Sequence, residues 1–164
     1  MPDSVPQVVW RLGLDLNPID LFSDEQVEWL ELLVWPGQEH RAKKLRAAIN
    51  VARSDPPRVI RGNLLTDLEP LIATAPKGAT LVFFHTAVLA YVTPRQQRDG
   101  FAAMMRRRNV VWISNEAPSV FPDIARAAPP PARPGLFLLA IDGGAVAWTA
   151  PHGEAIDWFG GWIN

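Results

Sequence analysis

The sequence contains no cysteine, which excludes disulfide bonds and thiolate metal sites. No apolar run approaches the roughly 20 residues that a membrane-spanning helix needs. Neither sign of charge dominates, because 16 basic and 17 acidic residues give a net charge of −1. This balance argues against nucleic acid and anionic membranes as partners. The polar start MPDSVPQ also lacks the basic and then apolar pattern of a signal peptide. We therefore expect a cytoplasmic protein.

Motifs for catalysis and for cofactor binding are also scarce. The sequence has no G-x-S-x-G motif, which would indicate a serine nucleophile. Its two glycine pairs, at 143–144 and 160–161, do not follow a strand and open a helix, as a phosphate-binding loop does. The histidines His40, His85 and His152 lie far apart and show no metal-ligand spacing. We therefore expect no metal site.

What the sequence does contain is enough apolar material for one folded domain spanning residues 1–164. Hydrophobic residues make up 48% of the 164 positions, a share that can build a core. The seven tryptophans are the unusual part of this material. Four are expected in the core or between helices: Trp29, Trp35, Trp112 and Trp148. The tail DWFGGWIN holds Trp158 and Trp162, which we interpret as surface anchors for a partner.

Helices and strands alternate along the sequence. Capping signals and apolar spacing predict helices over about 24–34 after Ser23, 38–53, 67–74 after Thr66, and up to 107 after Thr93-Pro94. Apolar runs predict strands at 8–16, 58–64, 79–85 and 109–116, and a closing hairpin around Gly143-Gly144. The pattern predicts a three-layer, Rossmann-like α/β fold with a mostly parallel sheet and a C-terminal antiparallel hairpin. The strand at 79–85 should be covered on both faces.

Polar residues gather where the predicted strands end, which is where open α/β sheets bind ligands. The first strand ends at Asp15 and Asn17, the third at His85, and the fourth at Asn115 and Glu116. We expect the carboxyl ends of these strands to share one edge of the sheet. We also expect His85 to line a crevice there.

Two interpretations of these strand-end residues stay open. His85 serves function, or it is bonded to a nearby carbonyl or carboxylate. Asp15 holds a ligand, or it pairs with Arg11 or Arg61. The segment AVLAYV after His85 is predicted to form a short turn or 3₁₀ segment over the crevice, which Tyr91 would face.

Several runs resemble a family of uncharacterised bacterial proteins, a domain of unknown function. The runs are RLGLDLNPIDLFS, WLELLVWPGQEHRAKKLRAAINVARSDPPRVIRGN, ATLVFFHTAVLAYV and WISNE. The elements WP-x-Q-x-x-R and FH-x-A-x-x-x-Y occur in the right order and make the resemblance fairly specific. The family's fold is similar to that of class I S-adenosylmethionine-dependent methyltransferases. The chain resembles the C-terminal half of the family, without the first strand and its glycine-rich cofactor loop.

The resemblance also implies roles for individual residues. Asp15 would hold the cofactor ribose, with Asn17 beside it, and Asn63 would lie near the adenine. His85 would follow the fourth strand of that fold, where such enzymes place catalytic or substrate-binding residues. With His85 we group Glu116 as a catalytic candidate, and we assign Tyr91 and Asn115 to the substrate.

Three functions compete at this point. The first is a methyltransferase-like domain that binds S-adenosylmethionine and acts only with a separately encoded N-terminal half. The second is a non-catalytic binding or assembly module. The third is a small enzyme of another class that uses His85 and Glu116. An exposed strand edge and bare apolar surface would leave the isolated chain prone to association. We therefore expect a homo-oligomer, or a complex with the separate half.

Overall fold

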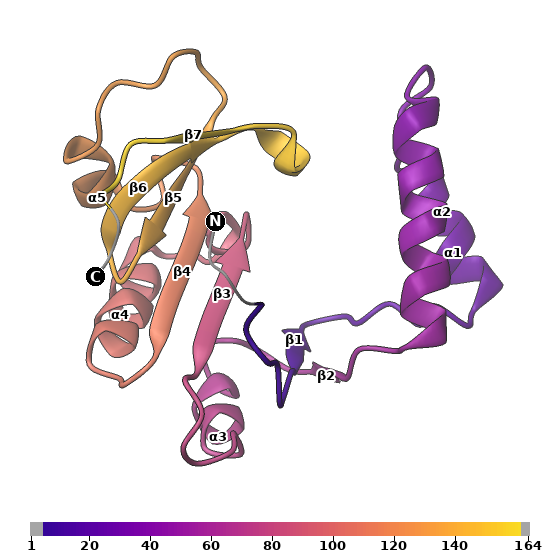
Figure 1. Cartoon of the computed structure of the whole chain (residues 1–164), viewed down its shortest axis with the longest axis horizontal. Coiled ribbons are helices and arrows are strands. Elements are labelled where there is room, and N and C mark those ends of the chain that lie inside the picture. The colour runs from indigo at the N-terminus through magenta and orange to yellow at the C-terminus, as the bar shows by residue number, and fades with distance from the viewer. Residues whose placement is uncertain (1–4, 162–164) are drawn as a thin grey trace. The chain divides into compact units, whose positions relative to one another are not determined.

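The computed structural model describes residues 5–161, and the chain divides into two compact units that meet in the sequence at Lys77 and Gly78. Figure 1 shows the helices and strands of both units. That residues 1–164 fold as one domain stays a prediction.

The first unit is a small α/β arrangement. Strand β1 (Gly13–Asp15) pairs in parallel with β2 (Val59–Arg61). The chain between them forms two helices, α1 (Asp24–Leu32) and α2 (Glu39–Ser54), and a short helix, α3 (Leu68–Ile72), follows β2. Because β1 and β2 run in the same direction, their carboxyl ends share one edge. The expectation that the first strand shares a sheet with the strands of His85 and Glu116 is wrong, because β1 and β2 form a separate sheet. Both strands are shorter than the runs at 8–16 and 58–64 suggested.

Helices α1 and α2 lie antiparallel and are joined by ion pairs. Nε of Arg46 lies 2.7 Å from the carboxylate of Glu31, and Arg53 lies 3.9 Å from that of Asp24. Glu31, near the C-terminal end of α1, pairs with Arg46 in the middle of α2. Asp24, the first residue of α1, pairs with Arg53 near the C-terminal end of α2. The two pairs therefore hold the helices together along their length.

The predicted helix caps are right for α1 and wrong for two other helices. Ser23 precedes α1, and its hydroxyl accepts a hydrogen bond from the backbone N–H of Gln26 at 3.5 Å. Helix α3 follows Asp67 rather than Thr66, because the Thr66 hydroxyl donates to the Asp67 side chain instead of capping the helix. Helix α4 (Arg95–Arg106) starts directly after Pro94, with no side-chain cap from the residue before it.

The second unit is built on a five-stranded sheet in the order β3-β4-β5-β6-β7. Its strands are β3 (Val82–Thr86), β4 (Val111–Glu116), β5 (Phe137–Ile141), β6 (Gly144–Thr149) and β7 (Ile156–Trp158). Its helical segments are η1 (Leu89–Tyr91), α4, α5 (Pro122–Arg126) and η2 (Pro151–Gly153). The 3₁₀ segment η1 falls where the sequence predicted a short turn after His85.

The expectation of a mostly parallel sheet is wrong for the second unit. Only β3 and β4 pair in parallel among the described strands, whereas β4–β5, β5–β6 and β6–β7 are antiparallel. The start of the tail, Asp157 and Trp158, forms β7 together with Ile156 and adds an antiparallel pair. Trp158 itself is exposed, and Trp162 lies outside the described residues. The mixed α/β class is correct.

The hairpin between β5 and β6 has its turn one residue earlier than predicted. Gly144 pairs with Ile141, so the two loop residues are Asp142 and Gly143. Their φ values are 51° and 83°, which fits the left-handed turn that suits a two-residue hairpin. Asp142 also accepts a hydrogen bond from the backbone N–H of Trp112 at 2.8 Å, which ties the turn to β4.

The buried apolar residues are distributed unevenly between the units. Within residues 5–77 only Ile49 and Leu68 are buried, whereas the second unit has a continuous core around β4 and α4. Trp112 and Trp148 are buried, as predicted. Trp29 is exposed, which corrects the expectation that it packs in the core. The same correction applies to Trp35.

Candidate functional site

His85 lies in the second unit, one residue before the end of β3, and its side chain is only 7% exposed. The ring packs edge-on against Phe101 of α4, with ring centroids 5.7 Å apart, and is stacked with Trp112 of β4 at 6.1 Å. The prediction that His85 lines an open crevice is therefore wrong. Strand β3 alternates between exposed and covered residues, and His85 falls on its covered face.

Both ring nitrogens of His85 have hydrogen-bond partners. The indole N–H of Trp112 donates to Nε2 at 3.0 Å, and Nδ1 lies 2.8 Å from Oε1 of Glu116. An indole nitrogen can only donate, so Nε2 accepts and has no proton. Nδ1 then carries the proton and donates it to the carboxylate. The chain Trp112–His85–Glu116 fixes a neutral imidazole in one tautomer.

Glu116 ends β4 and anchors the segment that follows β3. Its side chain is 2% exposed, and Oε1 also accepts from the backbone N–H groups of Val88 and Leu89 at 3.0 and 3.1 Å. These donors belong to the start of η1, just after Ala87 turns the chain with a φ of 52°. Three donors thus meet one carboxylate oxygen. The pair His85 and Glu116 lies together at the carboxyl ends of β3 and β4, as the parallel register predicted.

The two residues assigned to a substrate differ in their surroundings. Tyr91, at the end of η1, is 86% exposed. The Asn115 side chain is tied to its neighbours in the sheet, since it accepts from Thr149 Oγ1 at 2.8 Å and donates to Thr86 Oγ1 at 3.4 Å. Tyr91 is thus available to a ligand or a partner, whereas the amide of Asn115 already has partners.

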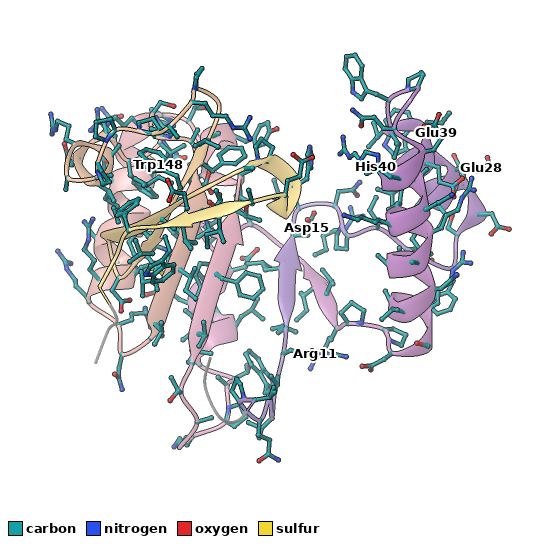
Figure 2. All side chains as sticks on the ribbon, turned by 45° about the horizontal axis from the view of Figure 1, so that its top comes forward. Arg11, Asp15, Glu28, Glu39, His40 and Trp148 are labelled. Atoms are coloured by element: carbon teal, nitrogen blue, oxygen red, sulfur yellow. The ribbon has the colours of Figure 1, made fainter. Side chains whose placement is uncertain are left out.

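The predicted cofactor residues lie in the first unit. Asp15 ends β1, and its Oδ1 accepts from the backbone N–H of Asn17 at 2.7 Å. Asn17 in turn accepts from Arg61, at the end of β2, at 2.9 Å. Arg11 pairs with Asp55 and Arg61 bonds to Asn17, so neither arginine considered for Asp15 pairs with it. Figure 2 shows Arg11 and Asp15 apart on the first unit.

A hollow of about 430 Å³ adjoins these strand ends. Asn17 and Arg61 line one side, and Glu28, Trp29 and Leu32 of α1 line the other. A volume of this size falls in the range of small-molecule sites. Two other hollows of the first unit have similar volumes, of about 390 and 430 Å³, so the volume alone does not single out this edge.

Asn63 follows β2 and shapes a turn. Its Oδ1 accepts from the backbone N–H of Leu65 at 2.9 Å, and its own N–H donates to Asp67 at 2.7 Å. The Asn63 side chain therefore hydrogen-bonds within its own turn. The predicted residues fall into two groups: Asp15, Asn17 and Asn63 belong to the first unit, and His85, Tyr91, Asn115 and Glu116 belong to the second.

Trp112 is the residue of this site that sequence reasoning missed, because it was assigned to the core on its apolar bulk alone. The signal was its spacing, since Trp112, Ser114 and Glu116 alternate along β4 and all three are buried. Residues two apart on a strand share a face. The indole N–H is therefore expected on the same face of the sheet as the carboxylate.

The described residues show no metal centre: within 5–161, no three His, Asp or Glu side chains gather as ligands. Nor does any helix in this part of the chain have both the length and the apolar character to cross a bilayer.

The fold and the site define a mixed α/β protein with a buried Trp–His–Glu chain. Residues 1–158 match a bacterial family described as "Uncharacterized protein conserved in bacteria (DUF2332)", and the chain belongs to that family. This confirms the resemblance to uncharacterised bacterial proteins. No curated protein and no solved structure matches the chain.

Proposed function

We propose that this protein is a binding and assembly module, and that the first unit is its contact surface. The observation that carries the proposal is the imbalance of that unit: two of its described residues form a buried core, while large apolar side chains stand exposed. Leu32 is 76% exposed and Trp29 is 60% exposed. Large apolar side chains that stand exposed together often mark a surface that binds a partner.

The exposed face of α1 is apolar and acidic. Glu25, Glu28, Trp29 and Leu32 are spaced i, i+3, i+4 and i+7, so they form one stripe along the helix. All four are exposed. Every charged residue of α1 is acidic, and neither Glu25 nor Glu28 has an ion-pair partner within residues 5–161. We call this stripe the acidic stripe.

Helix α2 carries a complementary face. Lys44, Ala47, Ala48 and Val51 follow the same spacing and are all exposed, and Lys43 adjoins them. The small side chains leave a hollow of about 430 Å³, which Ala47, Ala48 and Val51 help to line. No ion-pair partner of either lysine is recorded in the described part of the chain. We call this face the basic stripe.

The two stripes are complementary in side-chain size and in charge, which supports a second copy of the chain as the partner. The bulky Trp29 and Leu32 match a surface hollowed by alanines, and carboxylates meet ammonium groups. In a two-fold dimer the acidic stripe of each copy would pack on the basic stripe of the other, so that the same contact forms twice. Complementary charges would favour this pairing over others.

The role of the buried histidine agrees with this proposal. Nε2 and Nδ1 of His85 are both bonded inside the unit, which leaves no ring nitrogen directed at a ligand. Catalysis by His85 and Glu116 stays a prediction, and the hydrogen bonds favour an internal role for the pair.

Sedimentation velocity of a double variant with two shortened side chains tests the proposal. Replacing Trp29 and Leu32 together by serine removes the anchors of the acidic stripe, and we expect self-association to weaken by about tenfold or more, equivalent to about 1.4 kcal/mol. Both side chains are exposed, so the fold should be kept. Phe84→Ser is the matched control, because Phe84 is 73% exposed but belongs to β3. Equal effects of the two changes would contradict the assignment.

A second candidate function is ligand binding where β1 and β2 end, as the methyltransferase resemblance implies. The hollow beside Asn17 and Arg61 is the observation that favours it. Calorimetric titration with S-adenosylmethionine tests this candidate. A dissociation constant of about 1 µM or lower, roughly −8 kcal/mol, that is lost in Asp15→Ala would support it. Weak or absent binding would leave assembly as the function, or make the cofactor dependent on a separately encoded half.

A further inference from the structure

A small cavity adjoins Ser114 and Glu116 of β4, at the Glu116 end of the Trp112–His85–Glu116 chain. Its volume is about 10 Å³. The walls are largely apolar and include Pro118, Phe121 and Leu138, while Ser114 and Glu116 of β4 supply its polar side chains. Both polar residues are 2% exposed, so the polar side of the cavity lies in the buried core.

The second carboxylate oxygen of Glu116 is the unexplained group at this cavity. Oε1 accepts three hydrogen bonds, whereas Oε2 is buried and has no partner in the protein. Leaving a buried acceptor unpaired costs about 1–3 kcal/mol, and more for a charged group. Native structures rarely tolerate this cost without a bound water or ion.

We propose that the cavity is a binding site for a single water molecule. The water donates one hydrogen bond to Oε2 of Glu116 and forms a second with the hydroxyl of Ser114. The volume matches the roughly 10–15 Å³ that one water needs, and the two side chains give the minimum of two polar partners. A hard cation does not fit, because such ions take six or more oxygen ligands.

This water has a consequence for the surface of the second unit. By satisfying Oε2 it keeps the Glu116 carboxylate in place as the acceptor for Val88 and Leu89. Those bonds hold η1, which presents the exposed Tyr91. The water thus helps to hold η1 in place at the surface. This role does not depend on whether the chain self-associates.

A high-resolution crystal structure of the wild-type protein tests the proposal without any substitution. The expected result is a water peak at about 2.5–3.0 Å from Oε2, the range of an O–H···O hydrogen bond. In solution, the backbone amides of Ser114 and Glu116 should show NMR cross-relaxation with a long-lived water. A dry cavity, or a Ser114 hydroxyl bonded directly to Oε2, would overturn the proposal.

A conservative substitution adds a functional readout. Ser114→Ala removes one partner of the water, and we expect hydrogen exchange at the Val88 and Leu89 amides to rise by about tenfold, equivalent to about 1.4 kcal/mol. Ser119→Ala is the matched control, because Ser119 is exposed and does not line the cavity. Unchanged exchange in Ser114→Ala would contradict a water held by that hydroxyl.

Discussion

The indole nitrogen of Trp112 lies 3.0 Å from Nε2 of His85 and donates a hydrogen bond to it, inside the core of the second unit. This contact changes the meaning of the histidine. A side chain expected at a ligand crevice instead joins β3 to β4 and, through Glu116, to the start of η1. The contact also leads to measurements that separate an internal role from a catalytic one.

Replacing His85 by alanine should destabilise the protein by at least about 1–3 kcal/mol, the cost of leaving buried hydrogen-bonding groups without a partner. The variant leaves the Trp112 N–H without an acceptor and removes a donor from Glu116. Urea unfolding measures the loss. The control is His40→Ala on the exposed surface of α2, which should change stability by less than about 0.5 kcal/mol. A His85→Ala variant as stable as the control would show that the ring is dispensable to the fold.

The tautomer of His85 can be observed directly. Because an indole nitrogen cannot accept, the folded protein should hold the proton on Nδ1 and leave Nε2 bare. Long-range ¹⁵N–¹H NMR of the imidazole distinguishes the two nitrogens. We expect an Nδ1–H signal near neutral pH, and a spectrum with the proton on Nε2 would contradict the hydrogen-bond geometry.

The ion pair between α1 and α2 predicts a dependence on pH. The side-chain hydrogen bond from Arg46 holds the pKa of Glu31 below its ordinary value of 4.5. A carboxyl with a depressed folded pKa contributes stability above its unfolded pKa, and that stability is lost as the pH falls through the folded pKa. The contact between the helices should therefore weaken in acid, below about pH 4.5.

Arg46→Gln provides the check on this assignment. Without the guanidinium, the pKa of Glu31 should rise toward its ordinary value, which ¹³C NMR of the carboxyl group would show. Lys43→Gln removes a charge from the same helix without touching the hydrogen bond and serves as the control. If both variants leave the titration of Glu31 unchanged, the hydrogen bond is not the cause.

Charge reversal tests whether the acidic and basic stripes meet across a dimer. The variants E25K/E28K and K43E/K44E should each associate more weakly than the wild type, since like charges would then face each other in both contacts. Mixing the two variants should restore a heterodimer, because each stripe again meets its opposite. A mixture that remains as weak as its components would exclude this pairing of stripes.

Much of the element order was predictable because it rests on local signals. Ser23 and the proline at 94 mark helix starts within one residue, and the parallel register of β3 and β4 brings His85 to Glu116. Local signals do not determine whether a later strand pairs in parallel or antiparallel with its neighbour. The pairing of β5 with β4 is antiparallel, and no residue within β5 encodes that choice.

The parallel order of the strands predicted that His85 and Glu116 lie close together, and they are hydrogen-bonded. The burial of the ring was not predictable, because it depends on Phe101 of α4 and Trp112 of β4, which come from distant parts of the sequence. The exposure of Trp29 was missed for a related reason. Helical spacing predicts that a tryptophan lies on a covered face, but it does not indicate whether the same chain or another chain covers that face.

The mass of the wild-type protein in solution tests the assembly proposal most directly. Light scattering after size-exclusion chromatography, over a series from low to high micromolar protein, reports this mass without any substitution. The chain alone has a mass of 18.2 kDa. Pairing of the acidic and basic stripes predicts a mass that rises toward twice that value as the concentration increases. A mass that stays at 18.2 kDa throughout would contradict self-assembly.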